Sequence, residues 1–180
     1  GMALPPADDP GADRTFETLD ELLEDVRGPF VQGDAAVIHG LYIDGGYDNN
    51  GGGAVLGFAY GGARMVMLRD TIDASCADPA LALLPGGLAE QACHTLEAAV
   101  LLHEVGHLFG LVNNGLDMVE PHQDPENGAH DVDNGCLMYW AAETPDFAGT
   151  LSNRFLNDDT TIPGFDAACL ADLDAALQAQ

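Results

Sequence analysis

The apolar segment from Thr95 to Leu108 restricts the fold of this chain more than any other feature. Thr95 can cap a helix, Glu97 is favourable in its first turn, and Gly110 is placed to end it. Apolar residues cover nearly the whole circumference, which is the pattern of a helix that is buried on all sides. We therefore expect the central helix of the fold here, with the other elements packed around it.

Three polar residues interrupt this apolar helix: His103, Glu104 and His107 form the pattern HExxH. Residues i and i+4 of a helix share one face, with Cβ atoms about 6 Å apart, so the two imidazoles can hold one metal ion. Glu104 lies beside that face, where its carboxylate could take a proton from metal-bound water. Two histidines and a glutamate are costly to bury alone, and a zinc ion would compensate them. The alternative is a pair of core histidines bonded to the backbone, which leaves a buried glutamate unexplained.

The residues after this helix resemble the signature of the metzincin peptidases, HExxHxxGxxH. The match runs from His103 to Gly110, whereas the third ligand position holds Asn113, a weak zinc ligand. Further on, His130-Asp131, four residues and then Cys136-Leu137-Met138 resemble the HC-x4-C-x-M run of the archaemetzincins, in which that histidine is the third ligand. The resemblance covers roughly residues 95 to 140, with 19 residues between the glycine and the histidine where the family has two, which indicates a loop insertion.

The resemblance implies an α/β (α+β) fold of zincin type: a mixed twisted sheet, the active-site helix, a Met-turn loop and a C-terminal helix. It implies one catalytic zinc ion held by His103, His107 and His130, with Glu104 as general base and Met138 as the Met-turn residue. Tyr139 could hydrogen-bond a transition-state oxyanion, although an aromatic packing role is also open. Asp131 replaces the family's first cysteine and the later cysteines are missing, so a second zinc site is not expected to carry over.

Other ligands compete for the third position. His122 also lies in the insertion and could reach the metal if the loop folds differently. Asp117, Asn113 or no third protein ligand are the remaining alternatives. The acidic stretches Asp44–Asp48 and Asp131–Asp133 could bind calcium, but neither has EF-hand spacing, and solvated loops are the simpler interpretation.

Hydrophobic periodicity and turn residues predict the remaining elements of a single domain over residues 14–180, after a flexible arm at residues 1–13. The family fold begins with a strand before its first helix, and no such strand is evident before Thr15. The predicted elements are a helix at 15–26, a strand at 36–43, a hairpin of 54–60 and 64–69, an irregular connection at 71–92 with a helical turn at 80–84, a long loop at 111–164 and a helix at 165–177.

Four cysteines without a CxxC pair argue against a zinc ribbon or a thioredoxin-like site. Their even number allows two disulfides, for which we favour Cys76 with Cys93 and Cys136 with Cys169; four free thiols are the alternative. Disulfides would indicate an oxidising, extracytoplasmic or secreted location. The chain shows no basic region followed by an apolar stretch that would be a signal peptide.

The charge of the chain excludes some partners. Its 180 residues carry 30 acidic groups against five arginines and no lysine, a formal net charge of −25. Such a surface repels phosphate backbones and anionic lipids, so we expect no nucleic-acid partner, and no apolar run is long enough to span a membrane.

The motifs together predict a zinc metalloendopeptidase that acts on a peptide or protein substrate. The substrate could add as a strand to the sheet edge, which we place along Arg64 to Arg69. A non-catalytic or degenerate metal-binding protein of the same fold is the main alternative. A calcium-dependent extracellular interaction protein is a third.

Overall fold

The computed structural model describes residues 13–49 and 52–179. The predicted N-terminal arm falls outside these ranges, apart from its last residue. The helices are α1 (Phe16–Val26), α2 (Arg69–Cys76), α3 (Pro79–Ala82), α4 (Leu88–Leu108), α5 (Phe147–Leu156) and α6 (Ala167–Gln178), with a short 3-10 helix η1 (Trp140–Glu143). The strands are β1 (Val31–Gln32), β2 (Ala35–Ala36), β3 (His39–Ile43), β4 (Gly57–Tyr60) and β5 (Arg64–Leu68). The predicted mixed α/β class is confirmed.

The main sheet is mixed and has the strand order β3-β5-β4. β5 runs parallel to β3 and antiparallel to β4, and Val66 pairs with both Leu41 and Phe58. The predicted hairpin is therefore confirmed as β4 and β5. Gly61 and Gly62, both with positive φ, form its turn. The prediction that Arg64 to Arg69 forms the sheet edge is wrong, because β5 is hydrogen-bonded on both sides; β4 is the edge on the hairpin side.

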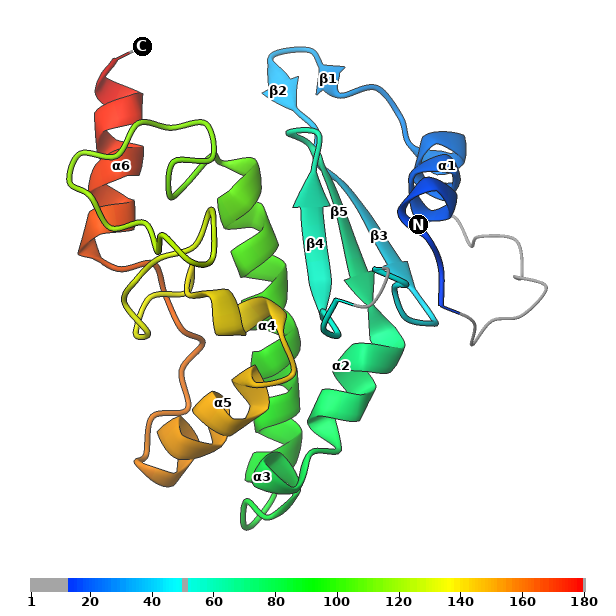
Figure 1. Cartoon of the computed structure of the whole chain (residues 1–180), viewed down its shortest axis with the longest axis vertical. Helices are drawn as coiled ribbons and strands as arrows, with labels where there is room; N and C mark the ends of the chain where they lie inside the picture. The colour runs from blue at the N-terminus through cyan, green and yellow to red at the C-terminus, as the bar shows by residue number, and fades with distance from the viewer. Residues whose placement is uncertain (1–12, 50–51, 180) are drawn as a thin grey trace.

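Helix α1 covers one face of the main sheet and α4 covers the other (Figure 1). One hydrophobic cluster lies between the sheet and each of these helices. Alternation along β5 divides its side chains between them: Val66 and Leu68 pack with α1, whereas Met67 packs with α4. Leu19 and Leu23 of α1 are fully buried in the first cluster, as the predicted amphipathic helix requires. The sheet therefore fixes the position of α4 within the molecule.

Helix α4 is central, as predicted, but it begins seven residues before the expected cap. Gly87, in a left-handed conformation, precedes its first residue, and Thr95 lies buried within the helix. Leu88, Ala89 and Ala92 pack into the core and extend the apolar pattern toward the N-terminus. The prediction of an irregular connection over 71–92 is therefore wrong, because this stretch contains most of α2 and the start of α4. The short helical turn predicted within it is present as α3.

The segment 111–164 has more regular structure than its composition suggested. η1 and α5 lie within the predicted loop, and α5 packs against α3 and α4. Leu151 and Phe155 of α5 are buried in the same core as Leu96, and the Ser152 hydroxyl donates a hydrogen bond to the Ala80 carbonyl at 2.6 Å. The Gly, Ser and Asn residues of α5 have low helix propensity, so the sequence did not predict this helix, which tertiary packing stabilises.

The cysteines are paired in the predicted way, but only one pair is bonded. The Cys76–Cys93 disulfide joins α2 to α4 and confirms that prediction. Cys136 and Cys169 are buried free thiols with sulfurs 3.7 Å apart, so the predicted second disulfide is wrong. The neighbouring Cys136 thiol and burial raise the pKa of Cys169, which keeps it protonated.

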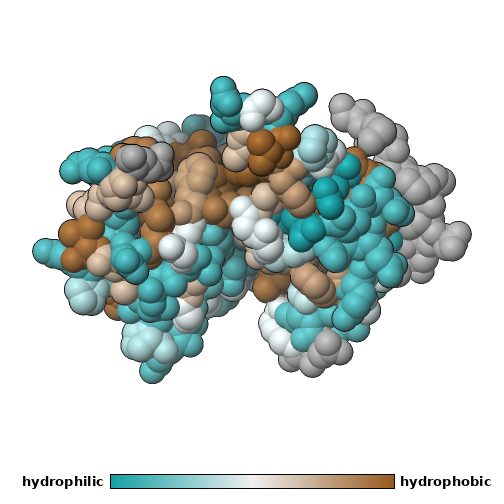
Figure 2. Space-filling view, turned by 90° about the horizontal axis from the view of Figure 1, so that it is seen from above, coloured by the Kyte–Doolittle hydropathy of each residue, from teal (hydrophilic) through white to brown (hydrophobic). Residues whose placement is uncertain are grey.

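The face seen from above carries both hydrophilic and apolar side chains (Figure 2). Viewed from above, its outline is notched between the half with the C-terminal elements and the half with the sheet and α1 (Figure 2). No described helix is both long and apolar enough to cross a bilayer.

Candidate metal centre

The structure brings three of the predicted residues together. His103 and His107 lie one turn apart on α4, and His130 reaches them from the loop that follows α4. The His130 ring lies 5.2 Å from the His103 ring and 5.0 Å from the His107 ring, measured between centroids. The 19-residue segment between Gly110 and His130 thus returns to the helix face that carries the HExxH histidines.

Backbone carbonyls fix the orientation of two of these rings. His103 Nδ1 bonds to the Leu137 carbonyl at 2.7 Å, and His130 Nδ1 bonds to the Asn127 carbonyl at 2.6 Å. A carbonyl only accepts, so each Nδ1 carries a proton, and in the neutral ring Nε2 keeps a lone pair that can bind a metal. His103 Nε2 lies 3.0 Å from His107 Nε2, and His130 Nε2 is buried without a hydrogen bond of normal geometry. One ring nitrogen of each histidine thus lies within 4.8 Å of the others.

Burial keeps His103 and His107 neutral. Desolvation, reinforced by the neighbouring imidazoles, holds the pKa of His103 well below its usual range. The same causes lower the pKa of His107 to about 4. Both side chains are consequently neutral bases at pH 7, the form in which histidine binds a metal.

Glu104 is a buried acid without a partner. Its side chain is fully buried, and neither carboxylate oxygen has a hydrogen bond of normal geometry among the described residues. Burial raises its pKa well above the usual range, the Glu143 carboxylate raises it further, and the backbone of Ala59 in β4 partly opposes the shift. A carboxyl group so placed is unusual without a ligand or a catalytic role.

Glu143 joins the same cluster, although the sequence analysis did not identify it. Its Oε2 atom lies 3.5 Å from His130 Nε2 and 3.9 Å from His103 Nε2. Ligand atoms of the three histidines and Glu143 all lie within 4.8 Å of one another, so this group could hold a metal ion. In the sequence, only its position five residues after Met138 could have indicated that Glu143 belongs to this site, because it follows no periodic pattern.

Met138 packs directly against the helix that carries the histidines. It is fully buried, and a Cβ atom added at Gly106, between His103 and His107, would overlap the Met138 sulfur. The peptide after Met138 also contributes: the Met138 carbonyl accepts a hydrogen bond from the Asp131 amide at 2.8 Å, next to His130. Met138 thereby joins the helix to the loop that carries the third histidine.

Gly110 ends the helix and turns the chain sharply. It has φ +82°, and a Cβ atom there would lie 3.0 Å from the Leu116 nitrogen, so glycine is required. The turn leaves Asn113 exposed, with its amide donating to Gln123 Oε1 at 3.1 Å. Asp117 is exposed as well. Neither belongs to the histidine group.

His122, the other candidate for the third position, belongs to a separate buried network. Its Nδ1 bonds to Asp131 Oδ2 at 2.6 Å and its Nε2 to Asp172 Oδ2 at 2.8 Å. Burial lowers its pKa, but the bonds to Asp172 and Asp131 outweigh burial and raise it overall. Asp131, Asp166 and Cys169 form a second potential ligand group with His122, but both His122 nitrogens already have partners. His122 therefore bridges two buried carboxylates as an imidazolium.

We expect His122→Ala to cost about 3–5 kcal/mol of unfolding free energy at pH 6, because two buried carboxylates lose their cation. Since the pKa is raised on folding, the contribution is complete below the unfolded pKa of about 6.5 and is lost as pH rises through the folded value. Urea unfolding at pH 6 and pH 9 measures the difference, which should shrink at pH 9. His94→Ala, at an exposed position, is the control. An equal loss at both pH values would contradict the charged bridge.

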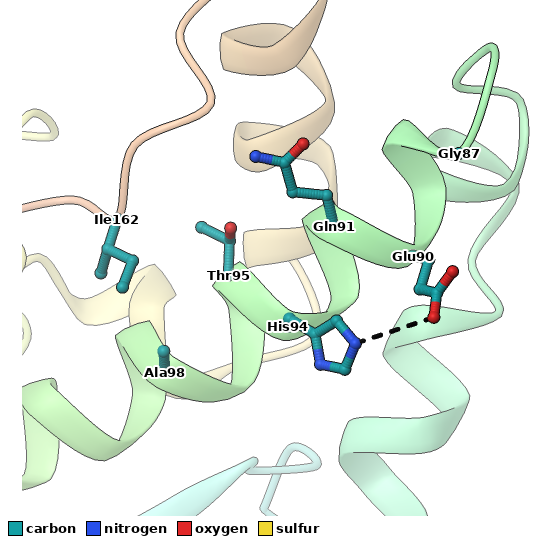
Figure 3. Close-up of a pocket in the computed structure, with 7 residues that line it drawn as sticks. All are labelled: Gly87, Glu90, Gln91, His94, Thr95, Ala98 and Ile162. Carbon is teal, nitrogen blue, oxygen red and sulfur yellow. Dashed lines mark ion pairs between the residues drawn. The ribbon is translucent and has the colours of Figure 1, made fainter.

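Tyr139 lines a cavity of about 470 Å³ together with Phe147 and Arg154, and its predicted oxyanion role stays a prediction. A hollow of about 500 Å³ lies over the first turns of α4, where Glu90 and His94 face each other at 4.0 Å (Figure 3). None of the predicted site residues lines this second hollow. The acidic loop Asp44–Asp48 contributes to neither potential metal group.

Comparisons with known proteins identify no relative of this chain. No protein-family model, no curated protein and no solved structure matches the chain.

Proposed function

We propose that the chain is a zinc-dependent metalloendopeptidase of metzincin type. One observation carries the proposal: ring nitrogens of His103, His107 and His130 converge beside Glu104, a fully buried carboxyl group with no hydrogen-bond partner among the described residues. A structural role alone would leave both Glu104 carboxylate oxygens and His130 Nε2 buried without a hydrogen bond among the described residues.

The donor set suits zinc. Imidazole nitrogen is a preferred zinc ligand, and three histidines form the protein half of many catalytic zinc sites. Bound there, zinc would polarise the scissile carbonyl and acidify water. Glu104 would receive the proton from the attacking water and pass it to the leaving amine, and its raised pKa makes the carboxylate a stronger base for the first of these two transfers. His103 and His130 would stay oriented by the Leu137 and Asn127 carbonyls.

The position of the edge strand β4 is consistent with a peptide substrate. β4 packs against α4, and the backbone of Ala59 in this strand lies close enough to Glu104 to affect its pKa. A peptide that pairs with β4 would thus run beside the candidate base. The substrate edge moves in this proposal from β5, where the sequence analysis placed it, to β4. The Cys76–Cys93 disulfide supports an oxidising, extracytoplasmic location for the enzyme.

Zinc content measured by elemental analysis tests the centre. We expect one zinc per wild-type chain and a large loss in His130→Ala, because removing a ligand leaves two histidines. His122→Ala, which changes the other candidate, should keep its zinc. The activity test uses the same wild-type protein and an unstructured protein as substrate: a chelator should stop cleavage and added zinc should restore it. Zinc retained in His130→Ala but lost in His122→Ala would overturn the assignment.

A second candidate is a non-catalytic zinc protein, and the position of Glu143 favours it. Four protein ligands around one ion are typical of closed, structural sites. Such a protein would bind zinc and lose it in His130→Ala, as above. It would leave the unstructured substrate uncleaved under all conditions, which separates the two functions.

A further inference from the structure

We propose that Glu143 is a fourth, displaceable ligand that closes the resting zinc centre, so that the enzyme is latent until a substrate or another ligand moves this side chain away. The inference rests on the proposed function. It adds a regulatory role for a residue that belongs to none of the sequence motifs.

The distances fit a four-ligand centre. In a tetrahedral site with bonds of about 2.0–2.1 Å, neighbouring ligand atoms lie about 3.3 Å apart. The observed separations are 3.0 Å between His103 and His107 nitrogens, 3.5 Å from Glu143 to His130, and 3.9 Å from Glu143 to His103. These three separations bracket the tetrahedral edge, and all six lie within 4.8 Å, so the four side chains would have to move closer to one ion to complete the geometry.

The hydrogen bonding of His130 determines what the Glu143 carboxylate can do when a metal is bound. His130 Nδ1 is committed to the Asn127 carbonyl, so Nε2 is the atom available to a metal. Once a metal holds Nε2, the Glu143 carboxylate has no proton to accept from this ring and faces the ion instead. Glu143 then either binds the ion or turns to solvent.

The backbone of Glu143 is fixed while its side chain has room to move. The Glu143 carbonyl accepts a hydrogen bond from the Leu56 amide at 2.7 Å, which ties η1 to the segment before β4. The Glu143 side chain is 24% exposed, whereas His103 is fully buried and His130 is 11% exposed. Release of this carboxylate to water is therefore the least costly way to open the centre.

Cobalt(II) substituted into the full chain reports the closure without relying on activity. In the wild type we expect visible absorption that azide does not change, because the fourth position is occupied. In Glu143→Ala azide should alter the spectrum, and competition with a chelator should show at least about tenfold weaker cobalt binding. Zinc-saturated Glu143→Ala should also cleave the unstructured substrate faster than the wild type.

Two further variants keep the test decisive. Glu143→Gln replaces Glu143→Ala if the latter fails to fold. Asp146→Asn removes the same charge from an exposed position three residues away, where the side chain forms no capping hydrogen bond. An azide response in the wild type equal to that of Glu143→Ala, equal affinities, an affinity loss shared by Asp146→Asn, or slower cleavage by Glu143→Ala would overturn the proposal. A wild type that binds neither cobalt nor zinc would instead overturn the proposed function.

Discussion

Glu104→Gln should retain its zinc and lose peptide hydrolysis by about 10²–10⁴-fold. The amide has nearly the shape of the carboxylate but cannot accept the proton that hydrolysis requires. The residue lies outside the group of ligand atoms, so metal binding should survive the change. Turnover of an unstructured protein by zinc-loaded wild type and variant, with zinc content measured on the same samples, gives both results.

Glu90→Gln is the matched control for this change. Glu90 lies on the same helix, is 86% exposed, and faces His94 far from any predicted site residue. It should keep full activity. The unfolding free energy of Glu104→Gln shows whether a loss of activity comes from misfolding. A buried carboxyl group without a partner costs free energy, so its replacement should not lower the unfolding free energy. Retained turnover in Glu104→Gln would remove Glu104 from the role of base.

Part of the candidate centre could be predicted from the sequence because two proposed ligands and the proposed base lie within about one helical turn. The spacing of His103 and His107 determines a shared face, and burial of Glu104 follows from the apolar residues around it. His130 was placed only through the resemblance around Met138, since nothing local specifies where a long loop returns. Glu143 was missed because its approach depends on how η1 docks between β4 and α4.

The same contrast applies to the fold. α1, β5 and α6 follow from local periodicity and turn residues, which act within a few positions. The pairing of β5 on both sides required knowledge of the strand order, which periodicity does not contain. α5 and the early start of α4 arise from long-range packing, as Ser152 bonded to Ala80 and Leu151 buried beside Leu96 illustrate. Tertiary contacts thus decided the elements that local propensity left ambiguous.

Zinc removal should lower the thermal stability of the wild type by about 10 °C. Zinc binds the folded chain, where His103, His107 and His130 converge, and a free ion at about 1,000 times its dissociation constant stabilises by about 4 kcal/mol. For a chain of this size, each kcal/mol shifts the melting temperature by about 2–4 °C. Calorimetry of the metal-free protein, before and after zinc is added, measures the shift.

The matched variants decide whether the shift comes from the proposed centre. His103→Ala removes a fully buried ligand and should abolish most of the zinc-dependent gain, whereas His94→Ala, 74% exposed, should preserve it. His122→Ala should melt at a lower temperature with or without zinc and still show the full gain, because its network is separate. If the gain persists in His103→Ala and disappears in His122→Ala, the ion binds the second group and the peptidase site is wrongly placed.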